Sequence, residues 1–151
     1  MIDIENLVFD TVYTQLASVI TDISVNVTAG YDENEAVFPT LIVRETGNLD
    51  YQKTSTEACS ENHARVTYEL EVWSDKQSTG RSECKRILNA ADNIMKGMNF
   101  RRIYKSRPFN IDRTRWRQYS RYDAIVEKGK QKTVTVDGQQ VVNTVFQIYR
   151  R

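Results

Sequence analysis

Apolar residues recur about every 3.6 positions along two stretches of the chain, and each stretch predicts an amphipathic helix. The first carries its apolar residues at Ile4, Leu7, Val8, Val12, Leu16 and Ile20. Asp3 precedes it, where a carboxylate can cap free backbone N–H groups. The second runs from about Thr79 to Lys96 and carries its apolar stripe at Cys84, Ile87, Leu88, Ala91, Ile94, Met95 and Met98. Gly97 follows, and glycine commonly ends a helix.

Between the two predicted helices, apolar and polar residues alternate as in half-buried strands. A short alternating piece covers residues 23–27. Phe38 and then Leu41, Ile42 and Val43 predict a strand that begins after Pro39. Residues 63–73 show the clearest alternation. Their apolar face carries Val66, Tyr68, Leu70 and Val72, and their polar face carries Arg65, Glu69 and Glu71. We expect Glu69 and Glu71 to be solvated, because charged residues on a strand face usually are.

The C-terminal third of the chain is predicted to hold further strands. One covers 100–104 and is broken at Pro108, and another covers 113–126. The last two flank Asp137-Gly138, a dipeptide typical of a two-residue β-hairpin turn. The order helix, strands, helix, strands predicts an α+β fold, with two amphipathic helices packed on a mixed or antiparallel sheet and a C-terminal β-hairpin. With 151 residues, the chain has the length of one domain, residues 1–151.

Residues 46–62 are polar, with almost no bulky apolar side chains to anchor them. A loop of that length without secondary structure is unusual inside a compact domain, and such loops are generally functional or become ordered on binding. We therefore predict a long loop at 46–62 that is mobile in the free chain and ordered against a neighbouring protein.

Charge is unevenly distributed along the chain, although the net charge is only +1. Residues 1–62 hold eleven acidic and two basic residues, a net charge of −9. Residues 101–132 hold eleven basic and three acidic residues, a net charge of +8. Two interpretations are open. Either the two regions neutralise each other within one fold, or the acidic flank of one subunit meets the basic flank of the next and so selects its partner.

Residue types that usually carry out chemistry are sparse. The two cysteines, Cys59 and Cys84, are expected to be free thiols in a reducing compartment. The single histidine, His63, is interpreted as a polar residue at a strand entry, since no cysteine pair has zinc-ligand spacing. The glycines form no phosphate-binding loop, and no serine lies in a nucleophile elbow. We therefore expect no catalytic, metal-binding or cofactor-binding residues and no enzyme activity.

The most conspicuous polar feature is a set of arginines in the predicted 113–126 strand. Side chains alternate along a strand, so one face is predicted to carry Arg113, Arg115, Arg117 and Arg121. Aromatic residues are interleaved with them, which fits two interpretations. The region is either a nucleic-acid surface on which rings stack on bases, or an aromatic core with a solvated or salt-bridged arginine face. We favour the second and expect DNA binding to be weak and independent of sequence.

Short signatures follow one another in a fixed order along most of the chain. A strand entry reads Phe38-Pro39, the strand at 68–73 reads YELEVW, and a polar Ser-Asp-Lys turn follows. The second helix ends in MKGMNFRR at 95–102, ahead of a terminal strand pair. With the N-terminal helix, this order resembles the tail terminator (tail completion) proteins of long-tailed bacteriophages. The extended hairpin around Asp137 departs from the smaller members of that family.

The resemblance implies a structural virion protein that forms a ring, usually a hexamer, at the head-proximal end of the tail tube. There the ring would end tube polymerisation and join the tail to the head. The implied partners are further copies of the chain, the tail tube protein and head–tail connector or neck proteins. DNA would only pass through the channel, and no membrane would be bound. The expected location is the virion tail or neck, and the host cytoplasm during assembly.

Combined with the uneven charge, a ring predicts a subunit interface in which acidic and basic residues of neighbouring copies meet. The expected interface residues are Asp32, Glu33, Glu35, Arg101, Arg102, Arg113, Arg115, Arg117 and Arg121. The alternative function within the same class is a head–tail connector or stopper (neck) protein. An alternative of another class is a nucleic-acid-binding module that uses residues 101–132.

Overall fold

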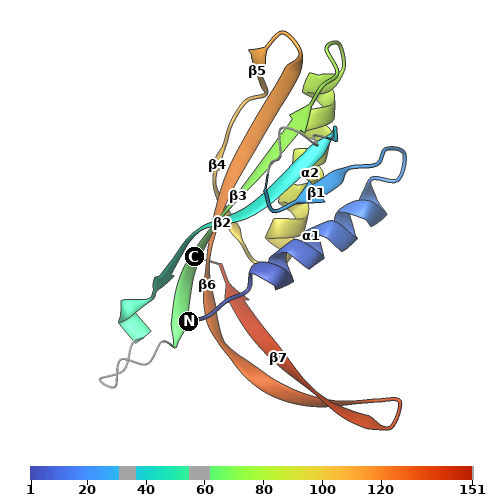
Figure 1. Cartoon of the computed structure of the whole chain (residues 1–151). Helices are drawn as coiled ribbons and strands as arrows, with labels where there is room; N and C mark the ends of the chain where they lie inside the picture. Colours follow the sequence, from blue (N-terminus) through green and yellow to red (C-terminus); the bar gives the residue numbers. More distant parts are fainter. Residues whose placement is uncertain (31–36, 55–61, 151) are drawn as a thin grey trace.

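The computed structural model describes residues 1–30, 37–54 and 62–150 (Figure 1). In chain order the elements are α1 (Glu5–Val19), β1 (Asn26–Thr28), β2 (Thr40–Asp50), the 3₁₀ helix η1 (Gln52–Thr54), β3 (His63–Ser74), α2 (Gly80–Gly97), β4 (Arg101–Lys105), β5 (Phe109–Asp112), β6 (Arg115–Val136) and β7 (Gln139–Tyr149). The structure is therefore of the predicted α+β class, and both predicted helices are present.

The strands of the described residues form one sheet in which β3 and β6 are central. The strand order is β1-β2-β3-β6-β4, while β5 and β7 also pair with β6 near its first and last residues. β1 lies parallel to β2, and the other pairs are antiparallel. β3 pairs with β6 along its whole length. The predicted mixed sheet with a C-terminal hairpin is thus confirmed.

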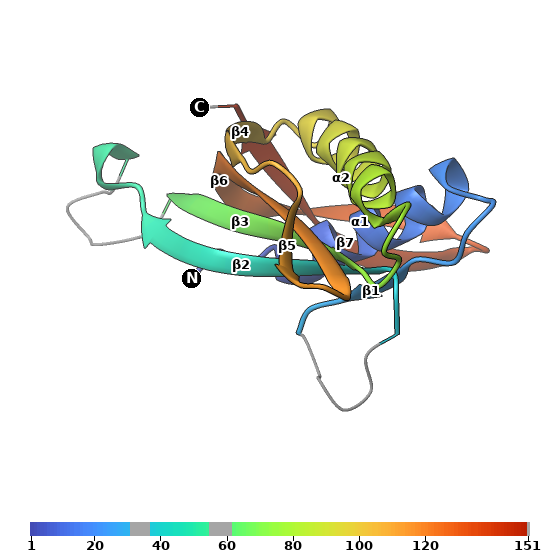
Figure 2. The ribbon, with the colours of Figure 1, turned by 90° about the horizontal axis from the view of Figure 1, so that it is seen from above.

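α1 and α2 share one core with the sheet, on the face that carries the apolar residues of β3 (Figure 2). α1 contributes Val8, Val12 and Leu16, and α2 contributes Cys84, Ile87, Leu88, Ala91, Ile94 and Met95. The sheet contributes Val66, Tyr68, Leu70, Val72, Tyr122, Ala124 and Val126. The ring of Tyr68 meets that of Phe100 edge-on, with centroids 5.5 Å apart. Helical and strand periodicities therefore identify most of the core, but Leu7 of the first helix is exposed.

α2 ends at Gly97, as predicted, but the reversal of the chain depends on Asn99. Asn99 has a φ of 68°, in the left-handed region that asparagine tolerates better than most residues. The backbone N–H of Phe100 then donates to the carbonyl of Met95 at 3.0 Å, which satisfies a helix-end acceptor. Phe100 is buried directly afterwards and anchors the start of β4.

The predicted loop at 46–62 is wrong for its first part. β2 continues to Asp50, paired with Ala64–Thr67 of β3, and η1 follows at Gln52–Thr54. The polar residues of 46–50 do not prevent a strand, because backbone pairing with β3 supplies hydrogen bonds that do not depend on side chains. A register shift between Glu45 and Gly47 accommodates the change along the strand. Residues 55–61 lie outside the described part of the chain.

β6 is longer than the 113–126 strand that the sequence predicts, because it continues into the C-terminal hairpin as far as Val136. The hairpin turns at Asp137 and Gly138, whose φ angles of 50° and 80° suit the tight two-residue turn predicted there. Beyond the register shift between Glu127 and Lys130, β6 and β7 leave the body of the molecule as a curved two-stranded ribbon (Figure 1). We call residues 130–145 the arm.

Candidate functional site

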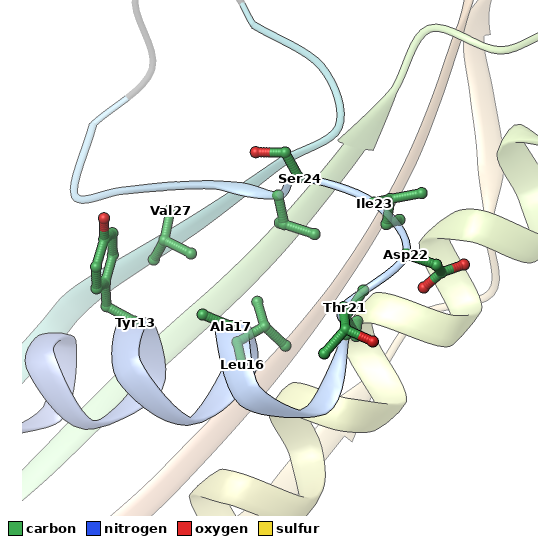
Figure 3. A pocket seen from close by; sticks show the side chains of 10 residues that line it. Tyr13, Leu16, Ala17, Thr21, Asp22, Ile23, Ser24 and Val27 are labelled. Atoms are coloured by element: carbon green, nitrogen blue, oxygen red, sulfur yellow. The ribbon is translucent and has the colours of Figure 1, made fainter.

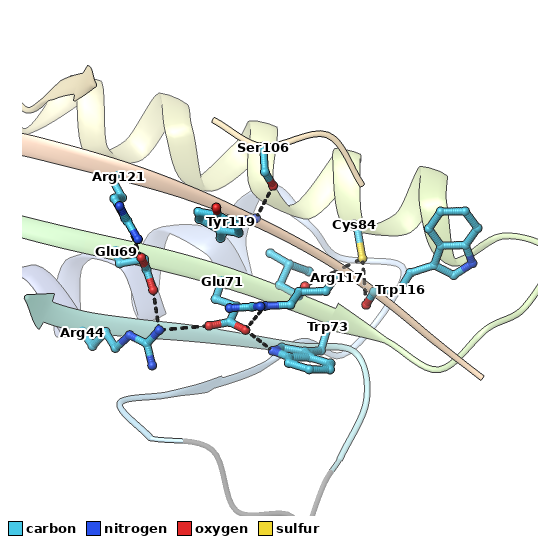
Figure 4. A network of polar contacts seen from close by, with 11 residues as sticks. Arg44, Glu69, Glu71, Trp73, Cys84, Ser106, Trp116, Arg117, Tyr119 and Arg121 are labelled. Carbon is cyan, nitrogen blue, oxygen red and sulfur yellow. Dashed lines mark hydrogen bonds and ion pairs between the residues drawn. The ribbon is translucent and has the colours of Figure 1, made fainter. Parts of the chain in front are cut away.

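The sheet face opposite the helices, which we call the open face, carries a row of charged side chains across three strands (Figure 4). Arg44 lies on β2, Glu69 and Glu71 on β3, and Arg117 and Arg121 on β6. We call these five residues the charge ladder. The strand register places Arg44 and Arg121 on either side of Glu69. Cross-strand neighbours of opposite charge are thus aligned by backbone pairing.

Each carboxylate of the charge ladder binds two arginines. Glu69 accepts a hydrogen bond from Nε of Arg121 at 2.7 Å and another from Arg44. Glu71 accepts one from Nη2 of Arg44 at 3.2 Å and another from Arg117. Arg44 therefore bridges the two carboxylates, and the ladder is one connected network of three positive and two negative charges.

The charge ladder corrects the expectation that Glu69 and Glu71 are solvated. Only 4% of Glu69 and 3% of Glu71 is exposed, because neighbouring strands and arginine side chains cover them. Burial alone would raise the pKa of Glu69, but hydrogen bonds from Arg44 and Arg121 outweigh it and hold that pKa below its ordinary value. The open face is therefore a partly desolvated ion-pair network.

Aromatic rings surround the arginines of the open face. The guanidinium carbon of Arg117 lies 5.5 Å from the ring centre of Trp73, 5.6 Å from that of Phe109 and 5.3 Å from that of Tyr119. That of Arg121 lies 5.6 Å from the Tyr119 ring. These distances allow cation–π attraction. The chain's own arginines therefore compete for the ring faces that a nucleic-acid surface would offer to bases.

Arg101 is held at the buried carboxylate of Asp123 on β6. Its Nε lies 3.2 Å from Oδ1 of Asp123, and Nη2 of Arg65 lies 3.3 Å from Oδ2. The Asp123 side chain is fully buried, so its charge depends on these arginines for compensation. Arg101 thus has a structural partner within its own chain.

Arg102 is held in the same way by Asp92 of α2, at 3.0 Å. The carboxylate of Asp92 also accepts a hydrogen bond from the hydroxyl of Tyr122 at 3.0 Å and pairs with Nζ of Lys96 at 2.6 Å. Burial would raise the pKa of Asp92, but the hydrogen bonds from Lys96 and Tyr122 together hold it below its ordinary value. Arg102 therefore helps to fasten α2 to the sheet.

The remaining arginines of the predicted interface differ in position. Arg113 is not on the strand, because the chain reverses there between β5 and β6. Asp112 fixes this turn by accepting hydrogen bonds from the backbone N–H of Thr114 at 2.8 Å and from its hydroxyl at 2.6 Å. The prediction that four arginines share one strand face is thus wrong for Arg113. Arg115 begins β6 and lies over the ring of Phe38, with 5.2 Å from guanidinium carbon to ring centre.

The acidic half of the predicted interface, Asp32, Glu33 and Glu35, lies outside the described residues. Of the arginines, Arg101, Arg102, Arg117 and Arg121 pair with acids at positions 123, 92, 71 and 69 of the same chain. Those acids do not belong to the acidic segment 1–62. Contact between the acidic and basic regions of neighbouring copies stays a prediction, and it would have to use charges beyond these pairs.

Two of the residues considered for chemistry, Cys84 and His63, lie in the described part of the chain. Burial raises the pKa of the Cys84 thiol to about 12, so it is a poor nucleophile at neutral pH. His63 begins β3, with its ring 6.3 Å from that of Tyr149, and Cys59 lies outside the described residues. Within the described residues, no three His, Cys, Asp or Glu side chains are grouped to hold a metal ion. No helix in that part of the chain is long and apolar enough to cross a membrane.

Sequence reasoning missed the role of Arg44 and the pairing of the two glutamates. The available signal was spacing. The carboxylates at 69 and 71 share one strand face, and the arginines at 117 and 121 share another. Such spacing suggests cross-strand pairs only when the strand order is known. The separation between β3 and β6 in sequence hid that order.

A scan against protein-family models matched no family, and a search among curated proteins found no similar chain. The resemblance to tail terminator proteins therefore rests on the signatures quoted above and on the order of the elements.

Proposed function

We propose that this chain is the subunit of a ring at the head-proximal end of a phage tail tube. The ring ends tube polymerisation and joins the tail to the head. Its copies contact one another, the tail tube protein on one side and head–tail connector proteins on the other, and the genome passes through the channel. The protein acts by shape and contact, in the virion tail or neck and before that in the host cytoplasm during assembly.

The observation that supports assembly most strongly is the position of exposed apolar side chains on two separate elements. The arm exposes Val136, Val141 and Val145, and α1 exposes Tyr13. Apolar surface that a chain leaves uncovered commonly marks a contact with another protein. Two such surfaces on one chain suit a head-to-tail contact, which closes into a ring when the rotation between copies permits.

The proposed place of the ring in the particle rests on the order of the sequence signatures along the chain. The fold is compatible with that order. The YELEVW segment is part of β3, the MKGMNFRR segment links α2 to β4, and the Phe38-Pro39 pair precedes β2. A head–tail connector or stopper protein is the alternative, since it would present similar surfaces at a neighbouring level of the particle. A nucleic-acid-binding module is less favoured, because Arg117 and Arg121 already bind Glu71 and Glu69.

Addition of the purified chain to polymerising tail tube protein tests the proposal. The expected result, seen by electron microscopy and analytical ultracentrifugation, is a closed ring of identical subunits that binds tube ends and limits tube length. Rings that bind a head connector but leave tube growth unchanged would favour the connector function. A chain that stays monomeric with tube ends present, or that binds DNA with a Kd near 10⁻⁸ M at physiological salt, as specific DNA-binding proteins do, would contradict the proposal.

A further inference from the structure

The two faces of the arm differ in composition: one carries most of its valines together with lysine, and the other is mostly polar. The register pairs Lys130 with Val145, and side chains alternate along both strands, so Lys130, Val136, Val141 and Val145 share one face. The exposed fractions of the three valines are 50%, 40% and 42%. The register places Gln139 and Asn143 on this face as well. The alternate positions are Gln131, Thr133, Thr135, Gln140, Val142 and Thr144. We call the first of these faces the valine face.

No second layer formed by the described residues covers the valine face. α1 and α2 cover the opposite side of the sheet, and the arm extends beyond both helices (Figure 1). A two-stranded ribbon is only marginally stable in water, and three strands or a packed layer are normally needed. A strand pair rich in valine therefore fits a surface that is covered in an assembly.

A groove suited to the valine face lies beside α1, on the side of this helix that is away from the arm. It has a volume of about 480 Å³ and lies between α1 and the segment that leads into β1 (Figure 3). Its lining residues include Tyr13, Leu16, Ala17, Ile20, Ile23 and Val27. Figure 3 shows the Tyr13 side chain pointing from α1 towards the strand above it. Thr21, Asp22 and Ser24 also line the groove, so its surface is apolar on the α1 side and polar in part, with the Tyr13 ring at one end.

Charge favours the arm of another copy as the occupant of this groove. Residues 1–43, which form α1 and the groove, contain no lysine, arginine or histidine and include Glu5 and Asp10 on α1. Residues 128–145 contain three lysines and one aspartate. Lys130 pairs with Glu127, with 3.3 Å between Nζ and Oε1, and its side chain is still 74% exposed. Asp22 of the groove pairs with Arg86 of α2, so the basic ribbon would be attracted mainly by the acidic residues of α1. Such complementarity steers partners and fixes their register.

The arm cannot dock in the groove of its own chain. The groove is on the side of α1 that faces β1, and the arm is on the other side of this helix (Figure 1). The donor surface and the acceptor surface are thus on opposite sides of one helix. In such an assembly each copy places its arm on one neighbour and receives the arm of the other neighbour in its groove. The contact can therefore repeat as a head-to-tail ring or filament.

We infer that the valine face of the arm docks in the α1–β1 groove of the next copy and is the main contact that joins the subunits. The inference deepens the proposed function and rests on it for the closed ring. The open face of the sheet then contributes little to self-association, because its charge ladder is paired within the chain.

Two variants test the arm and the groove separately. In the first, residues 131–144 are replaced by Asn-Gly, which closes the hairpin next to the body and removes the arm. In the second, Ala17→Arg fills the groove. Ser18→Arg is the matched control, because it places the same side chain on an exposed position of α1 outside the groove lining. Circular dichroism and thermal unfolding verify that each variant folds.

Sedimentation should show that each of the two variants self-associates at least about thirty-fold more weakly than the wild-type chain, the loss expected when a central interface anchor is removed. Ser18→Arg should assemble normally. A mixture of the two variants should give a dimer and no larger species, because one intact arm and one intact groove remain. Wild-type assembly by either folded variant, or a mixture that stays monomeric, would overturn the inference.

The failures of the two proposals are distinguishable. If rings depend on the arm and the groove but do not end tail tubes, the proposed function fails and the docking inference stands. If both variants still form rings that end tail tubes, the docking inference fails and the proposed function stands.

Discussion

The open face of the sheet and the arm share one strand, β6, but they differ in how their side chains are satisfied. On the open face, Arg117 and Arg121 bind the buried carboxylates of Glu71 and Glu69. In the arm, Val141 and Val145 are exposed, and the Lys130 side chain is 74% exposed. The first region satisfies its charges within the chain, and the second leaves apolar groups exposed.

This difference shows that a conspicuous row of charges is not necessarily an interaction surface. An arginine that compensates a buried carboxylate cannot change partner without leaving an uncompensated charge, which costs several kcal/mol. We therefore expect substitutions in the charge ladder to change the free energy of unfolding, and substitutions in the arm to change assembly. The predictions below test this division.

The largest effect is expected for Glu71→Ala. The substitution leaves Arg117 without its carboxylate and removes one of the two partners of Arg44. Breaking a buried pair typically costs about 3–5 kcal/mol, and we expect about 3 kcal/mol because both arginines are partly exposed and can be hydrated. Urea denaturation measures the loss. Asp75→Ala, at an exposed position just beyond β3, is the control and should change stability by no more than about 0.5 kcal/mol. Equal stabilities of the two variants would contradict the structural role of the ladder.

A smaller effect is expected where the arm leaves the body, at Gly129. A Cβ atom at this position would lie 2.3 Å from Cγ2 of Thr144 and 3.0 Å from the ring of Phe146. Gly129→Ala should therefore displace β7 and lower the free energy of unfolding by about 1–3 kcal/mol, the usual cost of overpacking.

Thr144→Ser supplies the control, because it removes the methyl group nearest to the new Cβ. In a double-mutant cycle the pair should be more stable than the sum of the single substitutions predicts. Additive effects would show that the contact with Thr144 does not cause the loss.

The two regions also differ in how far the sequence predicts them. The helices, the core and the Asp137-Gly138 turn follow from local periodicity and turn chemistry, which depend on neighbouring residues. The charge ladder joins Arg44 to residues 25 and 27 positions later, so it depends on strand order and register. Glu69 and Glu71 were expected in solvent because alternation gives the face of a side chain but does not show what covers that face.

The sequence predicts the arm only in part. The hairpin turn was predicted, but the length of β6 was not, because few apolar residues mark its middle section around Gly129. The extension of β2 to Asp50 was missed for the same reason, since polar residues can pair through their backbone when a partner strand is present. The groove between α1 and β1 had no sequence signal, because it depends on the spacing between packed elements.

The pH dependence of stability tests whether the charge ladder is ionised in the folded chain. The pKa of Glu69 is held below its ordinary value of 4.5, so in acid the unfolded chain binds more protons than the folded chain. The free energy of unfolding should therefore fall as the pH drops through 4.5 and towards the lower folded pKa. Asp92, whose pKa is also lowered, contributes in the same direction.

Glu69→Gln isolates the contribution of the ladder, because glutamine does not titrate. The variant should be less stable near neutral pH, and its stability should decline less steeply than that of the wild-type chain between about pH 5 and pH 3. Urea midpoints measured across this range give both slopes. Identical slopes would mean that Glu69 has the same pKa in the folded and unfolded chains.

The smallest effects are expected for substitutions at two glycines, which test whether the arm unfolds together with the body. Gly97 ends α2 with nothing within 4 Å of a Cβ, so Gly97→Ala should raise the free energy of unfolding of the whole body by about 0.5–1 kcal/mol. Gly138 has a φ of 80°, where alanine costs about 1 kcal/mol. If the arm opens separately from the body, this cost should appear as faster amide hydrogen exchange near the turn, by about five-fold, with little change in the urea midpoint. A lowered urea midpoint without faster local exchange would show that the arm unfolds only together with the body.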